Sequence, residues 1–367
     1  MSDFTNQLML TCLGNKRKLV GHIRQVVDEI RSCLGKDKLN IFDGFSGSSV
    51  VSRELSHVAD KIYANDLELY SYLMSYCYLI RPSEIQIHQI ESHINEMNKI
   101  ARNGPYTAGI ITKLYAPMDT NDVKLDERCF YTHENALIID TLRTYIEDHV
   151  EKDIQVYCLV PLLNKASIHT NTSGVFKGFY KDDNNKGCFG GQAKNALSRI
   201  MKPIELEMPI WNVDSNYKAF CFNKDINDLV KELPDDIDIM YLDPPYNQHP
   251  YGSNYFMLNV ISCNIEPEEL SKVSGIPKKW NKSKYNSKST AFDAMRDLIT
   301  ESLKKATYIL VSYNNEGIIK NEDWIKLLSG YEVKKYEIDY DTFRGSRNLK
   351  KRSNKVVEIM YLIKNRS

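Results

Sequence analysis

The sequence predicts a doubly wound α/β fold, with a mostly parallel sheet, an antiparallel edge and a mainly helical insertion. Short apolar runs alternate with amphipathic helical spacings at both ends of the chain, which is typical of parallel α/β sheets. This alternation is lost between about residues 81 and 219. Two apolar segments near the C-terminus can pair antiparallel at an edge. We therefore expect one domain from 1–80 and 220–367, and a separate insertion at 81–219.

The first half of the predicted domain reads as a βαβ unit. Apolar residues recur at helical spacing over Leu19–Leu34, and the run Lys38–Asp43 reads as a short buried strand. A turn of small residues, Gly44–Ser49, leads into a helix that starts at Val50–Leu55. Lys61–Asn65 then reads as the next strand, directly before Asp66.

The middle of the chain looks mostly helical, and the second half returns to alternating strands and helices. In the middle, apolar residues recur at helical spacing over residues 85–100 and again over 134–150. The apolar segment 157–166 fits either a helix or a strand. Residues 171–192 are polar and glycine-rich, as in a long loop. In the second half, we expect strands at 219–222, 237–242, 308–312, 334–340 and 356–363, and helices at 226–233 and 292–305.

Charge is informative in its distribution and not in its total. The 367 residues contain 48 basic and 48 acidic side chains, so net charge identifies no polyanionic partner. However, Lys272–Lys288 contains lysines and no acid, and the same holds for the basic run Arg344–Lys355. Such runs are usually solvated surface, and they also suit contact with a phosphate backbone.

Cysteine usage and the lack of long apolar runs bear on location. The eight cysteines are scattered singly, with no pair at metal-ligand spacing, so we expect no zinc site and no other bound metal. Scattered cysteines fit a reducing compartment. No segment resembles a signal peptide or approaches the ~18 apolar residues of a membrane span. We expect a soluble cytoplasmic protein without a membrane partner.

Two acids follow the first two predicted strands. Asp43 opens the glycine-bearing turn, which lacks the GxGxxG pattern of dinucleotide sites and so suits a ligand without phosphate that carries a positive group. An ordinary strand–helix turn explains this motif equally well. Asp66, which follows the second strand, fits an acceptor for ribose hydroxyls, and its alternative is a helix N-cap.

The most specific motif is Asp243-Pro-Pro-Tyr246, which directly follows an apolar strand. The prolines Pro244 and Pro245 stiffen the backbone and present the carbonyls of Asp243 and Pro244 rigidly. A carboxylate beside a carbonyl offers two acceptors to an –NH₂ group whose nitrogen must attack an electrophile. Tyr246 adds an aromatic face for a planar base. A proline-stiffened loop alone would not require the acid and the aromatic residue.

With this motif the chain resembles the Dam-like class of DNA adenine-N6 methyltransferases, and within it the FokI methylase branch. The matching segments follow one another in order over most of the chain: Gly14-Asn-Lys-Arg-Lys18, Phe42-Asp-Gly-Phe-Ser-Gly47, Tyr63-Ala-Asn-Asp66, Phe130-Tyr-Thr-His-Glu-Asn135, Asn171-Thr-Ser-Gly-Val-Phe176, Asp243-Pro-Pro-Tyr-Asn247, Tyr251-Gly-Ser-Asn-Tyr255 and Val311-Ser-Tyr-Asn-Asn-Glu-Gly317. The resemblance implies a Rossmann-like methyltransferase sheet with a target-recognition insertion, and S-adenosylmethionine as methyl donor.

The resemblance also implies roles for individual residues. Catalysis is expected from Asp243, Pro244, Pro245 and Tyr246. Contacts to the cofactor are expected from Asn15, Lys16, Phe42, Asp43, Gly47, Asp66 and Asp225. Contacts to DNA are expected from Lys177, Asn247, Tyr251 and Asn254. The basic run, and not the resemblance, adds expected phosphate contacts from the C-terminal hairpin, with protection of the sheet edge as the alternative: Arg344, Arg347, Lys350, Lys351 and Arg352.

The resulting hypothesis is site-specific methylation of a flipped-out adenine in double-stranded DNA, with S-adenosylhomocysteine as the product. Flipping costs a few kcal/mol, and stacking on Tyr246 returns ~1–3 kcal/mol. Double-stranded DNA is the expected partner, and the sequence leaves open whether a cognate restriction endonuclease is a second one. The alternatives are cytosine-N4 methylation, methylation of protein glutamine or RNA, and a DNA-binding specificity subunit without activity. An intact Asp-Pro-Pro-Tyr motif disfavours the last two.

Overall fold

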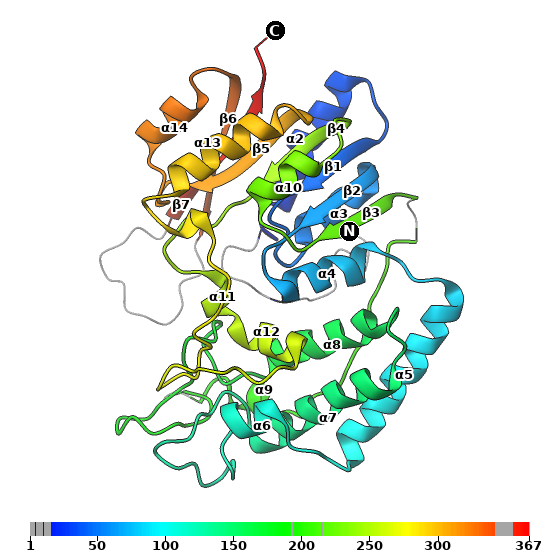
Figure 1. Ribbon diagram of the computed structural model, residues 1–367, viewed down its shortest axis with the longest axis vertical. Helices are drawn as coiled ribbons and strands as arrows, with labels where there is room; N and C mark the ends of the chain where they lie inside the picture. The colour runs from blue at the N-terminus through cyan, green and yellow to red at the C-terminus, as the bar shows by residue number, and fades with distance from the viewer. Residues whose placement is uncertain are drawn as a thin grey trace.

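The architecture is a seven-stranded mixed sheet next to a helical layer, as the sequence predicts (Figure 1). The computed structural model describes residues 4, 10, 16–191, 194–213, 216–341 and 355–366. Within these residues the sheet order is β3-β2-β1-β4-β5-β7-β6. All pairs from β3 to β5 are parallel, whereas β7 pairs antiparallel with β5 and β6. The strands are β1 Leu39–Asp43, β2 Ala59–Asn65, β3 Lys218–Phe222, β4 Ile237–Leu242, β5 Ala306–Asn314, β6 Glu332–Asp341 and β7 Lys355–Lys364.

Helices cover both faces of the sheet, because side chains along each strand alternate between two apolar cores. Ile41 of β1 packs into one core, whereas Phe42 packs into the other. The first core contains α2 (Val20–Leu34) and α3 (Val50–Leu55). The second contains α10 (Ile226–Glu232), α13 (Ala291–Ser302) and α14 (Asn321–Leu328), of which α14 was not expected from the sequence. This is the doubly wound arrangement.

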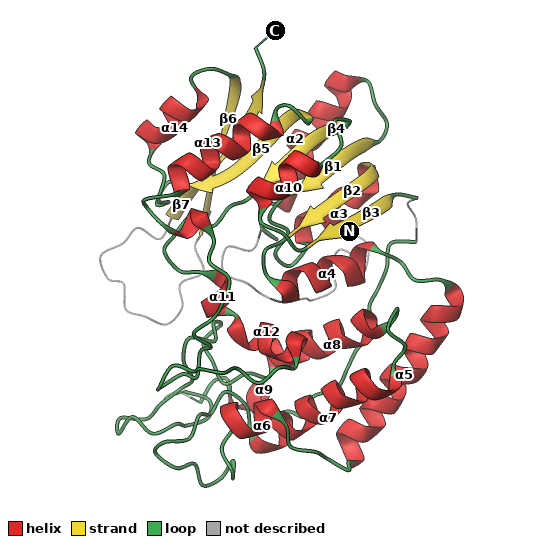
Figure 2. Ribbon diagram, viewed as in Figure 1, coloured by secondary structure: helices red, strands yellow, loops and turns green. Residues whose placement is uncertain are grey.

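The helical layer has its own apolar core and lies beyond the carboxyl ends of the parallel strands (Figure 2). It includes helices α11 and α12, which come from 220–367 and which the sequence did not indicate. The segment Tyr157–Ala166, ambiguous in sequence, lies in helix α8. The helices are α4 Leu69–Leu79, α5 Glu84–Asn103, α6 Ile110–Tyr115, α7 His133–His149, α8 Gln155–Ile168, α9 Leu197–Met201, α11 Tyr251–Asn254 and α12 Phe256–Cys263.

The polar loop that follows α8 is tied to the helical layer by one buried amide. Asn171 donates to the carbonyls of Cys129 and Cys188, at 2.8 and 2.9 Å, and accepts from the amide of Gly190 at 3.1 Å. Because a buried amide that satisfies three backbone groups fixes them relative to one another, the loop holds a defined position despite its composition. Among the described helices, none is long and apolar enough to cross a membrane.

Candidate active site

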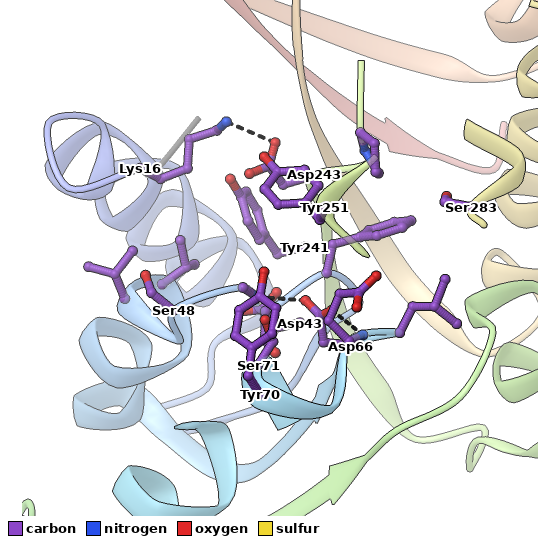
Figure 3. A pocket seen from close by; sticks show the side chains of 18 of the residues that line it. Lys16, Asp43, Ser48, Asp66, Tyr70, Ser71, Tyr241, Asp243, Tyr251 and Ser283 are labelled. Atoms are coloured by element: carbon purple, nitrogen blue, oxygen red, sulfur yellow. Dashed lines mark hydrogen bonds and ion pairs between the residues drawn. The ribbon is translucent and has the colours of Figure 1, made fainter. Parts of the chain in front are cut away.

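A single pocket lies where the predicted acids converge, at the carboxyl ends of β1, β2 and β4 (Figure 3). Asp43 ends β1, Asp66 follows β2 and Asp243 follows β4. Because these strands are parallel, their carboxyl ends meet at one edge of the sheet, although the residues are up to 200 positions apart. The pocket is further lined by Lys16, Phe45, Gly47, Glu68, Tyr241, Pro245, Tyr251, Asn281, Ser283 and Asn286, among others.

The turn after β1 depends on two glycines and two side-chain acceptors. A Cβ atom at Gly44 would lie 2.8 Å from Cδ2 of Leu242, so a larger residue there would require the Leu242 side chain to shift. Gly47 has a φ of +52° and donates its amide to Oδ2 of Asp66 at 2.8 Å. The hydroxyl of Ser52 donates to Oδ2 of Asp43 at 2.6 Å. The first bond joins the turn after β1 to the residue after β2, and the second joins the end of β1 to α3.

Burial dominates the electrostatics of the first two acids. The pKa of Asp43 is raised to about 7, mainly by burial and further by the nearby carboxylates of Asp243 and Asp66, while the Ser52 hydroxyl opposes the shift. Oδ1 of Asp43 is buried without a hydrogen-bond partner among the described residues. Burial also raises the pKa of Asp66 to about 6, against the amides of Glu68 and Gly47. Clustered acids with an unsatisfied oxygen favour a ligand that carries positive charge.

The third acid, Asp243, is held by an ion pair. Nζ of Lys16 lies 2.8 Å from Oδ1 of Asp243 and 3.2 Å from Oε1 of Glu358, on strand β7. Burial raises the pKa of Asp243 to about 6, Lys16 opposes this shift, and Glu358 adds to it. For Lys16, burial would lower the pKa, but the two carboxylates outweigh it and raise it. The ion pair thus favours the ionised form of Asp243.

The rest of the Asp-Pro-Pro-Tyr loop is fixed by aromatic and backbone contacts. Pro244 is buried and Pro245 lines the pocket. The ring of Tyr246 meets the ring of Tyr313 edge-on, with centroids 6.4 Å apart, and the Tyr246 carbonyl accepts from the amide of Ile318 at 2.8 Å. The loop is therefore anchored to β5 and to the segment that follows it.

Other predicted residues lie in or beside the pocket rim. Asn247 accepts, at its carbonyl, a hydrogen bond from the side chain of Asn286 at 2.7 Å, which brings the basic segment 272–288 to the pocket. Tyr251 lines the pocket and stacks on Tyr255, with centroids 5.9 Å apart. Nζ of Lys177, from the long loop, lies 3.5 Å from Nδ1 of His249. Loops distant in sequence thus meet beside the Asp-Pro-Pro-Tyr motif.

Some predicted residues lie away from the pocket or outside the described residues. Phe42 is fully buried in the core, and Asp225 caps α10 and pairs with Lys284 at 3.4 Å; neither lines the pocket. Asn254 is buried, and its side chain donates to the carbonyl of His249 at 3.3 Å. Asn15, Arg344, Arg347, Lys350, Lys351 and Arg352 lie outside the described residues.

Sequence reasoning missed several residues at the site. Burial raises the pKa of Glu68 to about 7, and its carboxylate accepts a hydrogen bond from the side chain of Asn259, in α12, at 2.6 Å. An acid two positions after Asp66 was a signal for it. Asn281 and Ser283 gave no signal beyond their place in a basic segment. Glu358 was visible as an acid inside the apolar strand segment 356–363.

Comparison with known families decides the class to which this geometry belongs. Residues 13–326 match the model of the D12 class of N6 adenine-specific DNA methyltransferases. The chain belongs to this family. The matched residues include Asp43, Asp66 and Asp243, which line the pocket, and the family uses S-adenosylmethionine as methyl donor. Within the described residues, no group of His, Cys, Asp or Glu side chains could hold a metal ion.

Relatives share this family over nearly the whole chain. The type II methyltransferase M.NlaIII of Neisseria lactamica is 26% identical over 96% of this chain and 98% of its own length. The modification methylase StsI of Streptococcus sanguinis is 28% identical over 96% of this chain, and the type II methyltransferase M.FokI of Planomicrobium okeanokoites is 25% identical over 96%. The chain spans 51% of StsI and 52% of M.FokI. The predicted resemblance to the FokI methylase branch is confirmed.

Proposed function

We propose that this adenine-N6 methyltransferase acts on a specific site in double-stranded DNA, with Asp243 as the acceptor for the adenine amino group. The observation that carries the proposal is the pairing of Asp243 with Lys16 at 2.8 Å, inside a pocket that also holds Asp43 and Asp66. An ionised carboxylate beside a proline-fixed carbonyl is the acceptor pair that an –NH₂ group requires.

The residues of the pocket fit S-adenosylmethionine. The unsatisfied Oδ1 of Asp43 and the low polarity of Phe45 beside it suit a ligand with a positive group and an apolar body. Asp66 and Glu68 offer carboxylate oxygens for ribose hydroxyls, and the backbone at Gly47 lets a ligand approach closely. When bound, S-adenosylmethionine supplies an electrophilic methyl group. We assign cofactor contact to these residues.

The chain's own residues then orient the base. Adenine cannot reach the pocket while stacked in a duplex, so we propose that it flips out, at a cost of a few kcal/mol. Asp243 and the carbonyl of Pro244 accept the two amino hydrogens, and the face of Tyr246 stacks on the ring. As positive charge develops on the nitrogen, the Asp243 carboxylate stabilises it. The methylated nitrogen then loses one proton to solvent, which leaves N6-methyladenine and S-adenosylhomocysteine as products.

We assign site choice to the helical layer and its loops. The insertion 81–219 contributes Lys177, which lies beside His249 of the catalytic loop. Asn247 and Tyr251 lie at the pocket rim, whereas Asn254 positions the loop from a buried place. Asn and Gln side chains can read adenine edges in the major groove. This surface is where duplex DNA would contact the protein.

The cellular role follows from the relatives. M.NlaIII and M.FokI are type II methyltransferases, and StsI is a modification methylase. We propose that this chain is the modification component of a restriction-modification system, acts in the cytoplasm where its DNA lies, and has a cognate endonuclease that cuts the same site.

The experiment is a side-by-side transfer assay with tritiated S-adenosylmethionine on DNA, RNA and protein. We expect label in duplex DNA, and N6-methyladenine as the only methylated nucleoside after digestion. N4-methylcytosine would assign the cytosine alternative, label in RNA or protein would change the substrate class, and DNA binding without label would indicate a specificity subunit. Methylation-aware sequencing of DNA from cells that express the chain identifies the site.

A further inference from the structure

A buried carboxylate lies on β7, in the antiparallel part of the sheet between β5 and β6. The side chain of Glu358, on β7, is only 1% exposed. Other buried residues of the same strand, such as Met360 and Ile363, are apolar. Its Oε1 lies 3.2 Å from Nζ of Lys16 and accepts from the hydroxyl of Ser312 at 2.6 Å. Its Oε2 has no hydrogen-bond partner among the described residues.

Burying a carboxylate in this way costs stability, since an apolar residue of similar size would pack without desolvating a charge. Structural acids avoid this cost by pairing fully or by lying at the surface, as Glu337 on the neighbouring strand does. Glu358 fits neither case, because β7 lies between β5 and β6 and Oε2 of Glu358 has no hydrogen-bond partner among the described residues. It also lies beyond residues 13–326, which match the family model. A role in the site accounts for its burial.

Lys16 connects this carboxylate to Asp243. Its ammonium, from the segment before α2, bridges Oδ1 of Asp243 and Oε1 of Glu358 (Figure 3 shows the contact with Asp243). Without Glu358 and Ser312, one flexible lysine chain would hold the acceptor from one side only. With them, the ammonium has two fixed partners, and its position determines the orientation of the Asp243 carboxylate.

We propose that Glu358, itself held by Ser312, is a positioning residue for methyl transfer, because it fixes the Lys16 ammonium against Oδ1 of Asp243. This inference rests on the proposed role of Asp243 as the acceptor for the amino group. Glu358 touches neither base nor cofactor in this account. It acts through Lys16, which thus serves the catalytic loop rather than the cofactor alone.

The charges around Asp243 predict how the pH dependence of methyl transfer changes when Glu358 is replaced, which a change in packing alone would not alter. Facing Asp243 are Lys16 from the N-terminal segment, Glu358 from β7, Asp43 from β1 and the phenol of Tyr241 from β4. Since the pKa of Asp243 is about 6, transfer falls as pH drops through that value and the carboxylate takes a proton. Glu358 raises this pKa, so its neutralisation moves the acid limb to lower pH.

The test is single-turnover methyl transfer by the full chain at saturating S-adenosylmethionine, measured against pH. For Glu358→Gln we expect the plateau rate to fall roughly 10- to 100-fold, as for a misplaced catalytic group. We also expect the acid limb to move to lower pH, with cofactor affinity unchanged. Glu337→Gln, the same change on an exposed residue of the adjacent strand, should match the wild type in both. If the plateau rate and the acid limb of Glu358→Gln both equal those of the wild type, the proposal is wrong.

A double-mutant cycle shows whether Glu358 acts through Lys16. In a Lys16→Met background, Glu358→Gln should cost little further rate, because the ammonium it positions is gone. An equal loss with and without Lys16 would contradict the proposal. Should Glu358→Gln fail to fold, Ser312→Ala removes the anchor and keeps the charge. It should lower the plateau, and a wild-type plateau in that variant would count against the proposal.

The variant Asp243→Asn, measured in the same assay, distinguishes a failure of the proposed role of Asp243 from a failure of the proposed role of Glu358. If Asp243→Asn keeps wild-type transfer, the proposed function of Asp243 fails. If Asp243→Asn is inactive while Glu358→Gln, Ser312→Ala and the cycle behave as the wild type, only the positioning role of Glu358 fails.

Discussion

Buried carboxylates are bonded differently in the helical layer and around the pocket of the sheet layer. In the helical layer, the carboxylate of Asp140 accepts from three amides before and within α6. Around the pocket, in contrast, Asp43 and Glu358 each keep a buried carboxylate oxygen without a hydrogen-bond partner among the described residues.

The difference separates architecture from chemistry. A buried polar group that is fully bonded to backbone stabilises one arrangement of the chain, whereas charges held close together with oxygens unsatisfied destabilise the empty site and favour a ligand. The raised pKa values of Asp43, Asp66 and Asp243 reflect this second use. We therefore expect changes around the pocket to alter turnover or cofactor binding, and changes in the helical loops to alter site choice.

The largest effect is expected for Asp243→Ala. Loss of one preorganised hydrogen-bonding group lowers turnover by ~10²–10³, and an unpaired amino group adds to that loss. Cofactor binding should survive, since Asp43 and Asp66 remain. Rapid-quench transfer and calorimetry measure the two separately, with Asp236→Ala, an exposed residue before β4, as the control. Turnover near the wild type would remove Asp243 from the mechanism.

A smaller effect is expected for Asp66→Ala, which should lower cofactor affinity rather than turnover. Charge-assisted hydrogen bonds contribute ~1.5–3 kcal/mol, so cofactor affinity should fall roughly 10- to 100-fold. The turn also loses the acceptor for the amide of Gly47. DNA affinity should change less. Calorimetry checks this against Asp60→Ala, an exposed residue of the same strand. Unchanged cofactor affinity would rule out the ribose role.

Exchange of the loops should change the site and leave the rate of transfer within a few-fold. We expect a chain whose residues 160–215 come from a relative of different specificity to methylate the relative's site, because the chemistry lies in the sheet layer. Methylation-aware sequencing reads out the site, and single-turnover assays on both sites give the rate. A site that does not move would place recognition elsewhere, with 265–289 as the next segment to exchange.

The smallest effect is expected from the basic run between β6 and β7, which lies outside the described residues. Changing Lys350, Lys351 and Arg352 together to serine should weaken DNA binding at every sequence. Each lost phosphate contact flattens the slope of log affinity against log salt by ~0.9, so roughly two to three units in total. Site choice should stay the same, because phosphate contacts carry no base information. Lys326→Ser, on exposed α14, is the control.

The same experiment tests the alternative for this run. Basic residues at a sheet edge also prevent edge-to-edge pairing. An unchanged slope with unchanged affinity would leave only that role, whereas a changed site would mean that these residues reach bases.

The sequence by itself determined the α/β plan and the three acids after the strands. Apolar period and turn residues are local properties, so they predicted β1, β2, β4 and the antiparallel pair β6–β7. Asp43, Asp66 and Asp243 were recognisable because each follows a strand, and parallel strands bring their carboxyl ends together. The motif Asp243-Pro-Pro-Tyr246 also fixed the reaction class, since its acceptor and aromatic groups are adjacent in the chain.

Only the tertiary structure decided what surrounds those acids. Helix α12 joins the helical layer because its apolar residues pack on α4 and α8, a choice that depends on the partner surfaces and not on its own pattern. Likewise, Lys16 and Glu358 lie 342 positions apart and meet only because β7 inserts between β5 and β6. Charge pairing of this kind leaves no periodic signal, since it depends on the order of strands in the sheet, which the sequence specifies only through the whole fold.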